Sequence, residues 1–502
     1  MNKHRLIKLF FLFVFPGLIF SSFAQWETVS PGFDYQKFVA SGATNVFVMR
    51  MALDNPRYRA VDSCVSQGQL SKFGLQYGGR EVVSSMVKRN DDTILYWGQR
   101  RQIIAAINGD YWERKSYPSG PYTGRPQGGQ IVSGWFARRF PEFTGGSGFF
   151  YTISGIPHIG GDVRNGATAD CHQRVIFADS SPAYLTGINV ERGANDLMLY
   201  TPQWGPSTQT DDSGVEVLVS VDSPNFPLNY GEPQNSCNGK IVEIRYNKGN
   251  TFIPFDHIVL SGTGSHAATL RNKCSSGQSL NLQMFIRDYG FPSNIRIPSH
   301  PPQDWTGAFA GIGCDREILI DSQLANPPKS DTTKRARTGV AFNKTHVFFV
   351  VVEETSQKGA SGMTFGEMAQ FCKDTLSATH ACSVDGGGSS VLWIRGKGIV
   401  NKPSDGGERA TCNGLFMISI QDKQQSSSFK PGAAVLTKSP ADIRLGPGTN
   451  YSPIANIPQS EKGTIVNHNL NGVLATGESW WNAQFGAASG WCSETALQSL
   501  PD

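Results

Sequence analysis

The chain has 502 residues, of which 39% are hydrophobic and 11% aromatic, so it can build the cores of two or three domains. Its 45 Lys and Arg residues nearly balance its 41 Asp and Glu residues, giving a formal charge of +4, and this balance argues against nucleic acid as a partner. Its 55 glycines favour turn-rich β structure.

The first 24 residues have the pattern of an export signal. A basic start, "MNKHRLIK", precedes an apolar run over 9–20 and the small-x-small sequence "SFA" before residue 25. The apolar run is shorter than the roughly 20 residues that span a bilayer. We therefore predict a secreted or periplasmic bacterial protein without a transmembrane anchor. Three of the 45 Lys and Arg residues lie in this segment, so the formal charge of the remainder is +1.

Most of the chain up to residue 420 consists of short apolar or alternating runs separated by Gly, Pro, Asn and Asp. These runs predict strands, for example over 103–107, 215–219, 253–260 and 346–352. One helix is well indicated, because Thr364 and Glu367 form a capping-box pattern and apolar residues then recur at helical spacing up to Leu376. The fold class predicted for this part is α+β, a mixed β-sheet domain with few helices.

After the helix, a short strand ending at Val384 leads into "DGGGSS" and then a second strand over 391–394. The amides of Gly386, Gly387 and Gly388 can point into one concavity, which suits an anion such as phosphate. The hydroxyls of Ser389 and Ser390 add donors, and Asp385 would face the atom attached to the phosphate. The same pattern is also typical of an ordinary hairpin loop, so the turn alone leaves both interpretations open.

A second polar stretch, "NKPSDGGER" over 401–409, follows that strand. Arg409 could grip a phosphate with its planar guanidinium. Asp405 offers a second carboxylate near Asp385, and Asn401 is a further candidate for substrate binding. The alternative is a solvated turn with a surface ion pair.

Four residues are second-rank candidates for the same site. Asn108 ends a strand, Arg337 precedes a buried strand, and Asp110 follows Asn108 closely. Glu216 lies within an apolar strand, where an unpaired carboxylate would be costly. A structural role is an equal alternative for Asn108, Arg337 and Glu216.

No metal is predicted, although Asp110, Asp385 and Asp405 could share a hard divalent cation through oxygen ligands. The nine histidines lack metal-binding spacings, and the nine cysteines lack a C-x-x-C pair. In an oxidising compartment some cysteines can be bridged, but their connectivity cannot be read from the sequence. An odd count leaves at least one unpaired.

Together, "SVDGGGSS" and "NKPSDGGER" resemble the closing signature of the phosphodiester glycosidase family. Upstream, the resemblance extends to "AAINGDYW" (105–112), "GGQIVSGW" (128–135), 195–219 and 337–353, so that it covers roughly 45–420. Two features depart from the family pattern. Ser383 and Val384 stand where relatives usually have Asn and Leu, and "GIGCDREILIDSQ" (311–323) is a degenerate glycine-rich block.

The resemblance implies an exported enzyme that hydrolyses sugar-1-phosphodiester bonds of a surface or extracellular glycan, releasing sugar and a phosphomonoester. Asp385 would be the leading carboxylate, Asp405 its partner, and Arg409 with the 386–388 amides the phosphate clamp. Two alternatives remain open: a non-catalytic polysaccharide-binding protein of the cell envelope, and a metal-dependent phosphodiesterase that cleaves P–O.

A polar linker over 421–432, "QDKQQSSSFKPG", divides the predicted catalytic domain (25–420) from a smaller one (433–502). The smaller part, with "IRLGPGTNY" and "GWC", resembles a bacterial SH3-type domain, a small all-β barrel. Such a resemblance implies binding of peptidoglycan or another cell-surface polymer, with aromatic side chains such as Trp480 and Trp481 offering stacking faces. The glycine turn and the tryptophans serve mainly to make the fold.

Overall fold

The computed structural model describes residues 25–40, 44–67, 80–95, 98–114, 122–138, 148–152, 154–160, 173–221, 237–284, 308–325, 332–354 and 362–500. The expected export signal over 1–24 lies outside this part. The described chain is largely β, with three α-helices, as expected from the sequence. None of these helices is long and apolar enough to cross a membrane.

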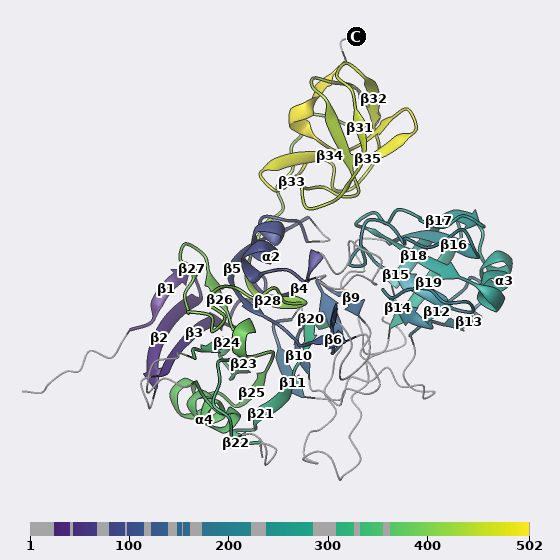
Figure 1. Ribbon diagram of the computed structural model, residues 1–502. Coiled ribbons are helices and arrows are strands. Elements are labelled where there is room, and N and C mark those ends of the chain that lie inside the picture. Colours follow the sequence, from purple (N-terminus) through teal and green to yellow (C-terminus); the bar gives the residue numbers. More distant parts are fainter. Residues whose placement is uncertain are drawn as a thin grey trace, which may run out of the picture.

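An eight-stranded antiparallel sheet forms one side of the main body (Figure 1). In spatial order its strands are β1 (Glu27–Ser30), β2 (Phe33–Ala40), β3 (Thr44–Ala52), β24 (His346–Val352), β23 (Arg337–Phe342), β25 (His380–Ser383), β21 (Arg316–Ile320) and β22 (Gln323–Leu324).

Two five-stranded sheets complete the main body. The first contains β27 (Gly398–Ile399), β26 (Leu392–Ile394), β5 (Arg100–Asn108), β28 (Asn413–Gln421) and β4 (Arg59–Val65). The second contains β11 (Pro157–Gly160), β10 (Gly148–Thr152), β20 (Ala308–Gly313), β8 (Gln130–Val132) and β9 (Trp135–Arg138). Helix α2 (Val83–Asn90) packs against β5, and β6 (Trp112–Arg114) pairs with β7 (Tyr122–Pro126).

The predicted strand over 346–352 is confirmed, and its burial explains its unbroken apolar sequence. Val347, Phe349 and Val351 point into the core between the sheets. The side chains in between, such as Phe348 and Val350, point to the opposite face, which is covered by α4 (Phe365–Leu376). Since both faces of β24 are buried, the strand shows no polar alternation.

The predicted helix is confirmed with its cap. The Thr364 side chain accepts a hydrogen bond from the Glu367 amide (3.1 Å), and the Glu367 carboxylate accepts one from the Thr364 amide (2.9 Å). The strands predicted over 103–107 and 215–219 are confirmed as parts of β5 and β16 (Val215–Val221). The strand expected over 253–260 begins only at residue 257, in β18 (His257–Gly262).

A further eight-stranded sheet lies within the predicted domain of 25–420, and its core is shared with Ile131, Phe150 and Ala308 of the second five-stranded sheet (Figure 1). Its strands in order are β13 (Pro182–Tyr184), β12 (Gln173–Ile176), β19 (Ser279–Met284), β17 (Cys237–Tyr246), β16, β18, β15 (Leu197–Tyr200) and β14 (Gly187–Ile188). Helix α3 (Gly264–Lys273) packs on β16 and β18. We call this part, residues 173–284, the side lobe.

The C-terminal residues form a small unit of antiparallel strands (Figure 1). These strands are β29 (Ala434–Thr437), β30 (Ala441–Arg444), β31 (Pro453–Ile457), β32 (Lys462–Ile465), β33 (Val473–Ala475), β34 (Glu478–Phe485), β35 (Ala488–Ser493) and β36 (Leu497–Ser499). An SH3-type barrel stays a prediction for this unit.

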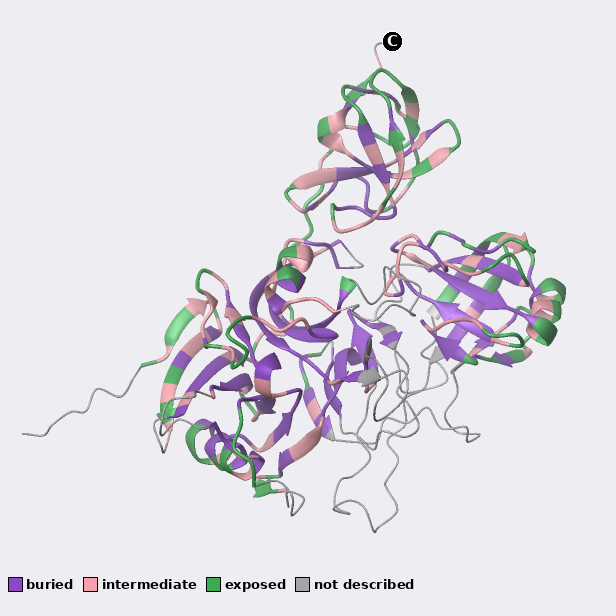
Figure 2. Ribbon diagram, in the orientation of Figure 1, coloured by how far each residue is buried: buried purple, intermediate pink, exposed green. Residues whose placement is uncertain are grey.

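The tryptophans of the C-terminal unit cannot serve as open stacking faces, so that part of the sequence interpretation is corrected. Trp480, Trp481 and Trp491 are each 2% exposed. Figure 2 shows buried residues running through the interior of this unit and along the sheets of the other parts. The aromatic rings fill cores instead, as expected for fold-making residues.

The C-terminal unit docks on the rest of the chain through a shared apolar cluster. Phe255 of the side lobe and Ile94 of the main body pack with Trp480 and Trp491. The Phe255 amide also donates to the Leu445 carbonyl (3.0 Å). The C-terminal unit is therefore attached to the rest of the protein by these packing contacts as well as by the linker over 421–432.

We expect Phe255→Ala to loosen this docking, because it removes a 2%-exposed ring from the shared cluster. The stability lost should be about 3 kcal/mol. Cleavage of 421–432 by a protease at low concentration should become faster, and calorimetry should show a lower Tm. Phe252→Ala is the matched control, since that ring is 49% exposed. Equal behaviour of the two variants would show that the docking does not depend on Phe255.

Candidate active site

The loop after β25 is anchored to the end of β5 by backbone and side-chain hydrogen bonds. The Asp385 amide donates to the Gly109 carbonyl (3.0 Å), and Asn108 Nδ2 donates to the Asp385 carbonyl (2.7 Å). Asn108 Oδ1 accepts from Thr338 Oγ1 (2.9 Å) and from the Val391 amide (3.2 Å). The Asn108 side chain thus joins β5 to β23 and to both ends of the loop, which makes it a residue that positions the loop.

The glycines of the turn are required for different structural reasons. A Cβ on Gly388 would lie 2.2 Å from both Arg409 Nη2 and Asp405 Oδ1, so a side chain there would displace this pair of side chains. Gly387 has φ +60°, a left-handed conformation that favours glycine, and its missing Cβ faces open space. Its amide donates to the Ala336 carbonyl (2.8 Å) and is not free for an anion.

Arg409 and Asp405 lie against the glycine turn as the sequence led us to expect. Arg409 Nε and Nη2 both donate to Asp405 Oδ2, at 2.7 and 2.6 Å. Their side chains are 36% and 43% exposed, so the pair lies at the surface of the site. The charge of Arg409 acts to lower the pKa of Asp385, which places the two residues in one site.

Three carboxylates gather behind this pair. Burial raises the pKa of Asp385 to about 6, against the opposing effects of the Ser389 hydroxyl, Arg409 and the Gly386 amide. Burial raises the pKa of Asp110 to about 7, although Asp110 accepts hydrogen bonds from the amides of Gly128 (2.6 Å) and Tyr111 (2.7 Å). The negative charge of Asp315 adds to both increases.

Sequence reasoning missed Asp315, which follows β20 in the degenerate glycine block. The amide of Asp315 donates to the Ser383 carbonyl (2.8 Å), and this hydrogen bond ties the block to the strand that leads into Asp385. The sequence signal that could have found it is a pair of adjacent charged residues, Asp315 and Arg316, directly after a glycine-rich apolar run. In the structure these two side chains form an ion pair, with 2.9 Å between Arg316 Nε and Asp315 Oδ2.

Several buried polar atoms beside Asp385 have no hydrogen-bond partner within the described residues. They are Asp385 Oδ2 and the Oγ atoms of Ser383, Ser389 and Ser390. Each unpaired buried polar group costs roughly 1–3 kcal/mol. Four in one place indicate a site whose partners come from a ligand or water.

Arg337 borders the same site from β23. Its Nε donates to the Met363 carbonyl (3.0 Å), and its guanidinium carbon lies 3.7 Å from the centre of the Phe365 ring. Arg316 approaches the same ring at 4.3 Å. Burial raises the pKa of Tyr111, and the negative charges of Asp385 and Asp315 raise it further. The positive charges of Arg337 and Arg316 oppose this increase.

Asn401 closes the turn between β26 and the second loop. Its Oδ1 accepts from the Leu392 amide (2.8 Å) and its Nδ2 donates to the Ser390 carbonyl (2.9 Å). The side chain therefore holds Ser390 in place, while substrate binding by Asn401 itself stays a prediction.

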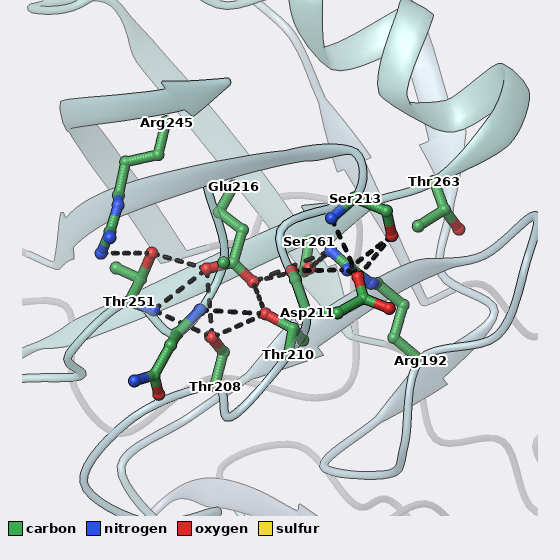
Figure 3. A network of polar contacts seen from close by, with 12 residues as sticks. Arg192, Thr208, Thr210, Asp211, Ser213, Glu216, Arg245, Thr251, Ser261 and Thr263 are labelled. Atoms are coloured by element: carbon green, nitrogen blue, oxygen red, sulfur yellow. Dashed lines mark hydrogen bonds and ion pairs between the residues drawn. The ribbon is translucent and has the colours of Figure 1, made fainter. Parts of the chain in front are cut away.

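Glu216 is not brought together with these residues, because it lies in β16 of the side lobe. Its buried carboxylate accepts hydrogen bonds from Thr208 Oγ1 (3.0 Å), Thr210 Oγ1 (2.7 Å), Thr251 Oγ1 (2.6 Å) and Ser261 Oγ (2.9 Å), as Figure 3 shows. This network fixes two loops of the lobe to the sheet and satisfies the carboxylate, so the geometry gives Glu216 a structural role.

No group of three or more His, Cys, Asp or Glu residues in the described ranges could hold a metal ion. A cavity of about 750 Å³ lies elsewhere, lined by α2, residues 393–396 and the C-terminal unit. None of the residues around Asp385 lines that cavity.

A family model, described as phosphodiester glycosidase, matches residues 236–418. This segment begins at the start of β17 and contains Asp385, Asp405 and Arg409, but not the earlier blocks around Asn108 and Asp110. The match suggests phosphodiester glycosidase activity. Curated proteins gave no match.

Three solved structures are similar at low identity. A hypothetical protein from Synechocystis has 12% identity and a TM-score of 0.44, covering 79% of this chain and 64% of that one. A protein from Burkholderia pseudomallei K96243, named as a candidate exported protein, has 18% identity, a TM-score of 0.45 and 74% coverage of each chain.

The third is the catalytic domain of zebrafish N-acetylglucosamine-1-phosphodiester alpha-N-acetylglucosaminidase, auto-inhibited by its pro-peptide. It has 13% identity and a TM-score of 0.36, covering 80% of this chain and 86% of that one. The Synechocystis protein is matched over less than two thirds of its length.

The raised pKa of Asp385 predicts how stability depends on pH. The folded state holds the proton up to about pH 6 and the unfolded state only up to about 3.8, so the free energy of unfolding falls as pH rises between these values. The neutral amide of Asp385→Asn does not titrate, so its free energy of unfolding should not fall in this way. Above pH 6 the variant should be more stable than wild type by about 3 kcal/mol. The difference should vanish near pH 4. Denaturant melts across this range measure it, with the exposed Asp374→Asn as control. A difference independent of pH would contradict the assignment.

Gly388→Ala should displace the Asp405 and Arg409 side chains from the glycine turn, because its Cβ would lie 2.2 Å from both. We expect a loss of stability of about 1–3 kcal/mol in denaturant melts. Gly407→Ala is the matched control in the same pair of loops, since a Cβ there meets nothing within 4 Å. Equal stability of the two variants would mean that the Asp405 and Arg409 side chains are not packed against Gly388.

Proposed function

We propose that the chain is an exported hydrolase that cleaves sugar-1-phosphodiesters, with Asp385 at the reacting centre. The observation that carries this proposal is the buried carboxylate of Asp385, with a pKa of about 6 and an unpaired oxygen, next to the guanidinium of Arg409. Perturbed carboxylates in such surroundings are typical of sites that move protons. The match of 236–418 to the phosphodiester glycosidase model supports the same reaction class.

The phosphate of the substrate would lie against the glycine turn. Arg409 would exchange its bond to Asp405 for the phosphate oxygens, since the pair is half-exposed and can separate. The hydroxyls of Ser389 and Ser390 would add donors. Because a phosphomonoester has a second pKa near 6, it is a good leaving group, and stabilising its developing charge matters more than protonating it.

The two perturbed carboxylates suit different roles. Near neutral pH, Asp385 is mostly ionised, whereas the pKa of Asp110, at about 7, keeps part of that group protonated. Asp385 would act as the base for water or as the nucleophile at the anomeric carbon, and Asp110 would donate a hydrogen bond or proton. Asp405 would serve the site by holding Arg409 when no phosphate is bound.

The substrate proposed is a surface or extracellular glycan with sugar-1-phosphate links. Its support is the export pattern over 1–24. The C-terminal unit would keep the enzyme near a cell-surface polymer. Since its tryptophans are buried, that contact would use its exposed polar residues.

Asp385→Asn should lower kcat for release of sugar from a sugar-1-phosphodiester by about 10²-fold or more, because no carboxylate then acts at the anomeric carbon. A panel of sugar-1-phosphodiesters, with N-acetylglucosamine 1-phosphodiesters included, should be followed by mass spectrometry of the free sugar. Asp374→Asn, an exposed position on α4, is the control and should keep full turnover. Wild-type turnover in Asp385→Asn would refute the role of Asp385.

The same assay separates the alternatives. Binding of the whole panel without release of sugar would favour a non-catalytic binder. In oxygen-18 water, label in the sugar would mean C–O cleavage, as proposed, and label in the phosphate would mean P–O cleavage. Loss of turnover with a chelator, restored by a divalent ion, would show that a metal takes part.

A further inference from the structure

Two buried cysteines lie in contact beneath the site. The Sγ atoms of Cys314 and Cys382 are 2.7 Å apart, which is within about 0.7 Å of the length of a disulfide bond. Both side chains are buried, at 4% and 0% exposure. They are among seven cysteines that the structure describes as thiols.

Both cysteines stand in the segments that carry the carboxylates. Cys382 lies in β25, three residues before Asp385. Cys314 lies between Asp315 and Gly313, and a Cβ on Gly313 would meet Asp110 Oδ2 at 2.5 Å. A link between the two sulfurs would therefore tie together the chain segments that hold all three carboxylates in position.

We propose that Cys314 and Cys382 form a disulfide bond when the protein folds in an oxidising compartment. Each thiol loses one proton and one electron, one S–S bond forms, and the two electrons reduce a disulfide of an exchange partner to two thiols. The exchange must take place before β25 and the 314–315 turn are buried, because the sulfurs of the folded protein are out of reach of a partner.

The surroundings of the pair oppose thiol exchange in the folded protein. Burial raises the pKa of Cys314 well above its ordinary value, and the neighbouring Cys382 and Asp110 raise it further. A thiol in such a place resists forming the thiolate that attacks in exchange. Once the bond has formed and is buried, reductants should reach it only after the protein unfolds.

The bond would constrain the geometry of the site. The two cysteines are 68 residues apart in sequence, so the crosslink closes a long loop of the unfolded chain. In the folded state it would hold the Asp315 turn against β25 and keep Asp315 beside Asp385. This inference concerns the covalent structure and stands whether or not the proposed reaction is correct.

Peptide mapping tests the bond directly, because trypsin separates the relevant cysteines. Cys314 falls in 297–316, Cys382 in 374–395 and Cys372 in 359–373. The full chain should be recovered from an exported preparation, unfolded with an alkylating reagent but without reductant, and digested. We expect 297–316 joined to 374–395, two hydrogens lighter than the two peptides together, and an alkylated 359–373.

Two variants complete the test. The double variant Cys314→Ala/Cys382→Ala should lose the crosslinked peptide and show a Tm roughly 5–10 °C lower. Cys372→Ala is the matched control, since Cys372 is buried close to Cys382 and should leave the crosslink in place. Alkylation of both Cys314 and Cys382 without reductant would overturn the proposal, as would a bond from either of them to another cysteine.

Discussion

The bonds between the end of β5 and the first residue of the glycine turn are the constraint on which the site depends. They hold the Asp385 backbone at two atoms, through the Gly109 carbonyl and the Asn108 side chain. The carboxylate of Asp385 is thereby kept away from water. Its raised pKa, its unpaired oxygen and its closeness to Asp110 all follow from that placement.

Burying Asp110 and Asp385 next to the half-buried Asp315 costs free energy, and the surrounding chain reduces this cost in particular ways. The Asp110 carboxylate accepts hydrogen bonds from two backbone amides, and Asp315 forms an ion pair with Arg316. Asp385 keeps one oxygen without a partner and stays the least satisfied of the three. The unpaired Asp385 oxygen and the three serine hydroxyls beside it are where a ligand can form hydrogen bonds.

The three parts of the molecule contribute differently. The main body supplies the residues around Asp385, whereas the side lobe uses its buried Glu216 to fix its own loops. The C-terminal unit packs its tryptophans inward and against Phe255. Through Phe255 and Ile94, the side lobe and the main body both contact the C-terminal unit, although these residues lie far from it in the sequence.

Local patterns in the sequence determined the α4 helix with its Thr364 cap, strand β24, and the turn that presents Asp385, because caps, apolar runs and glycines act over a few residues. They also indicated that Arg409 belongs beside that turn. Only the tertiary structure decided that Asp315 joins Asp110 and Asp385, that Asn108 positions the loop, and that Glu216 lies elsewhere. Those facts depend on the pairing of strands that lie hundreds of residues apart in the sequence. Such pairing is set by the packing of whole sheets, so it cannot be read from any short stretch of sequence.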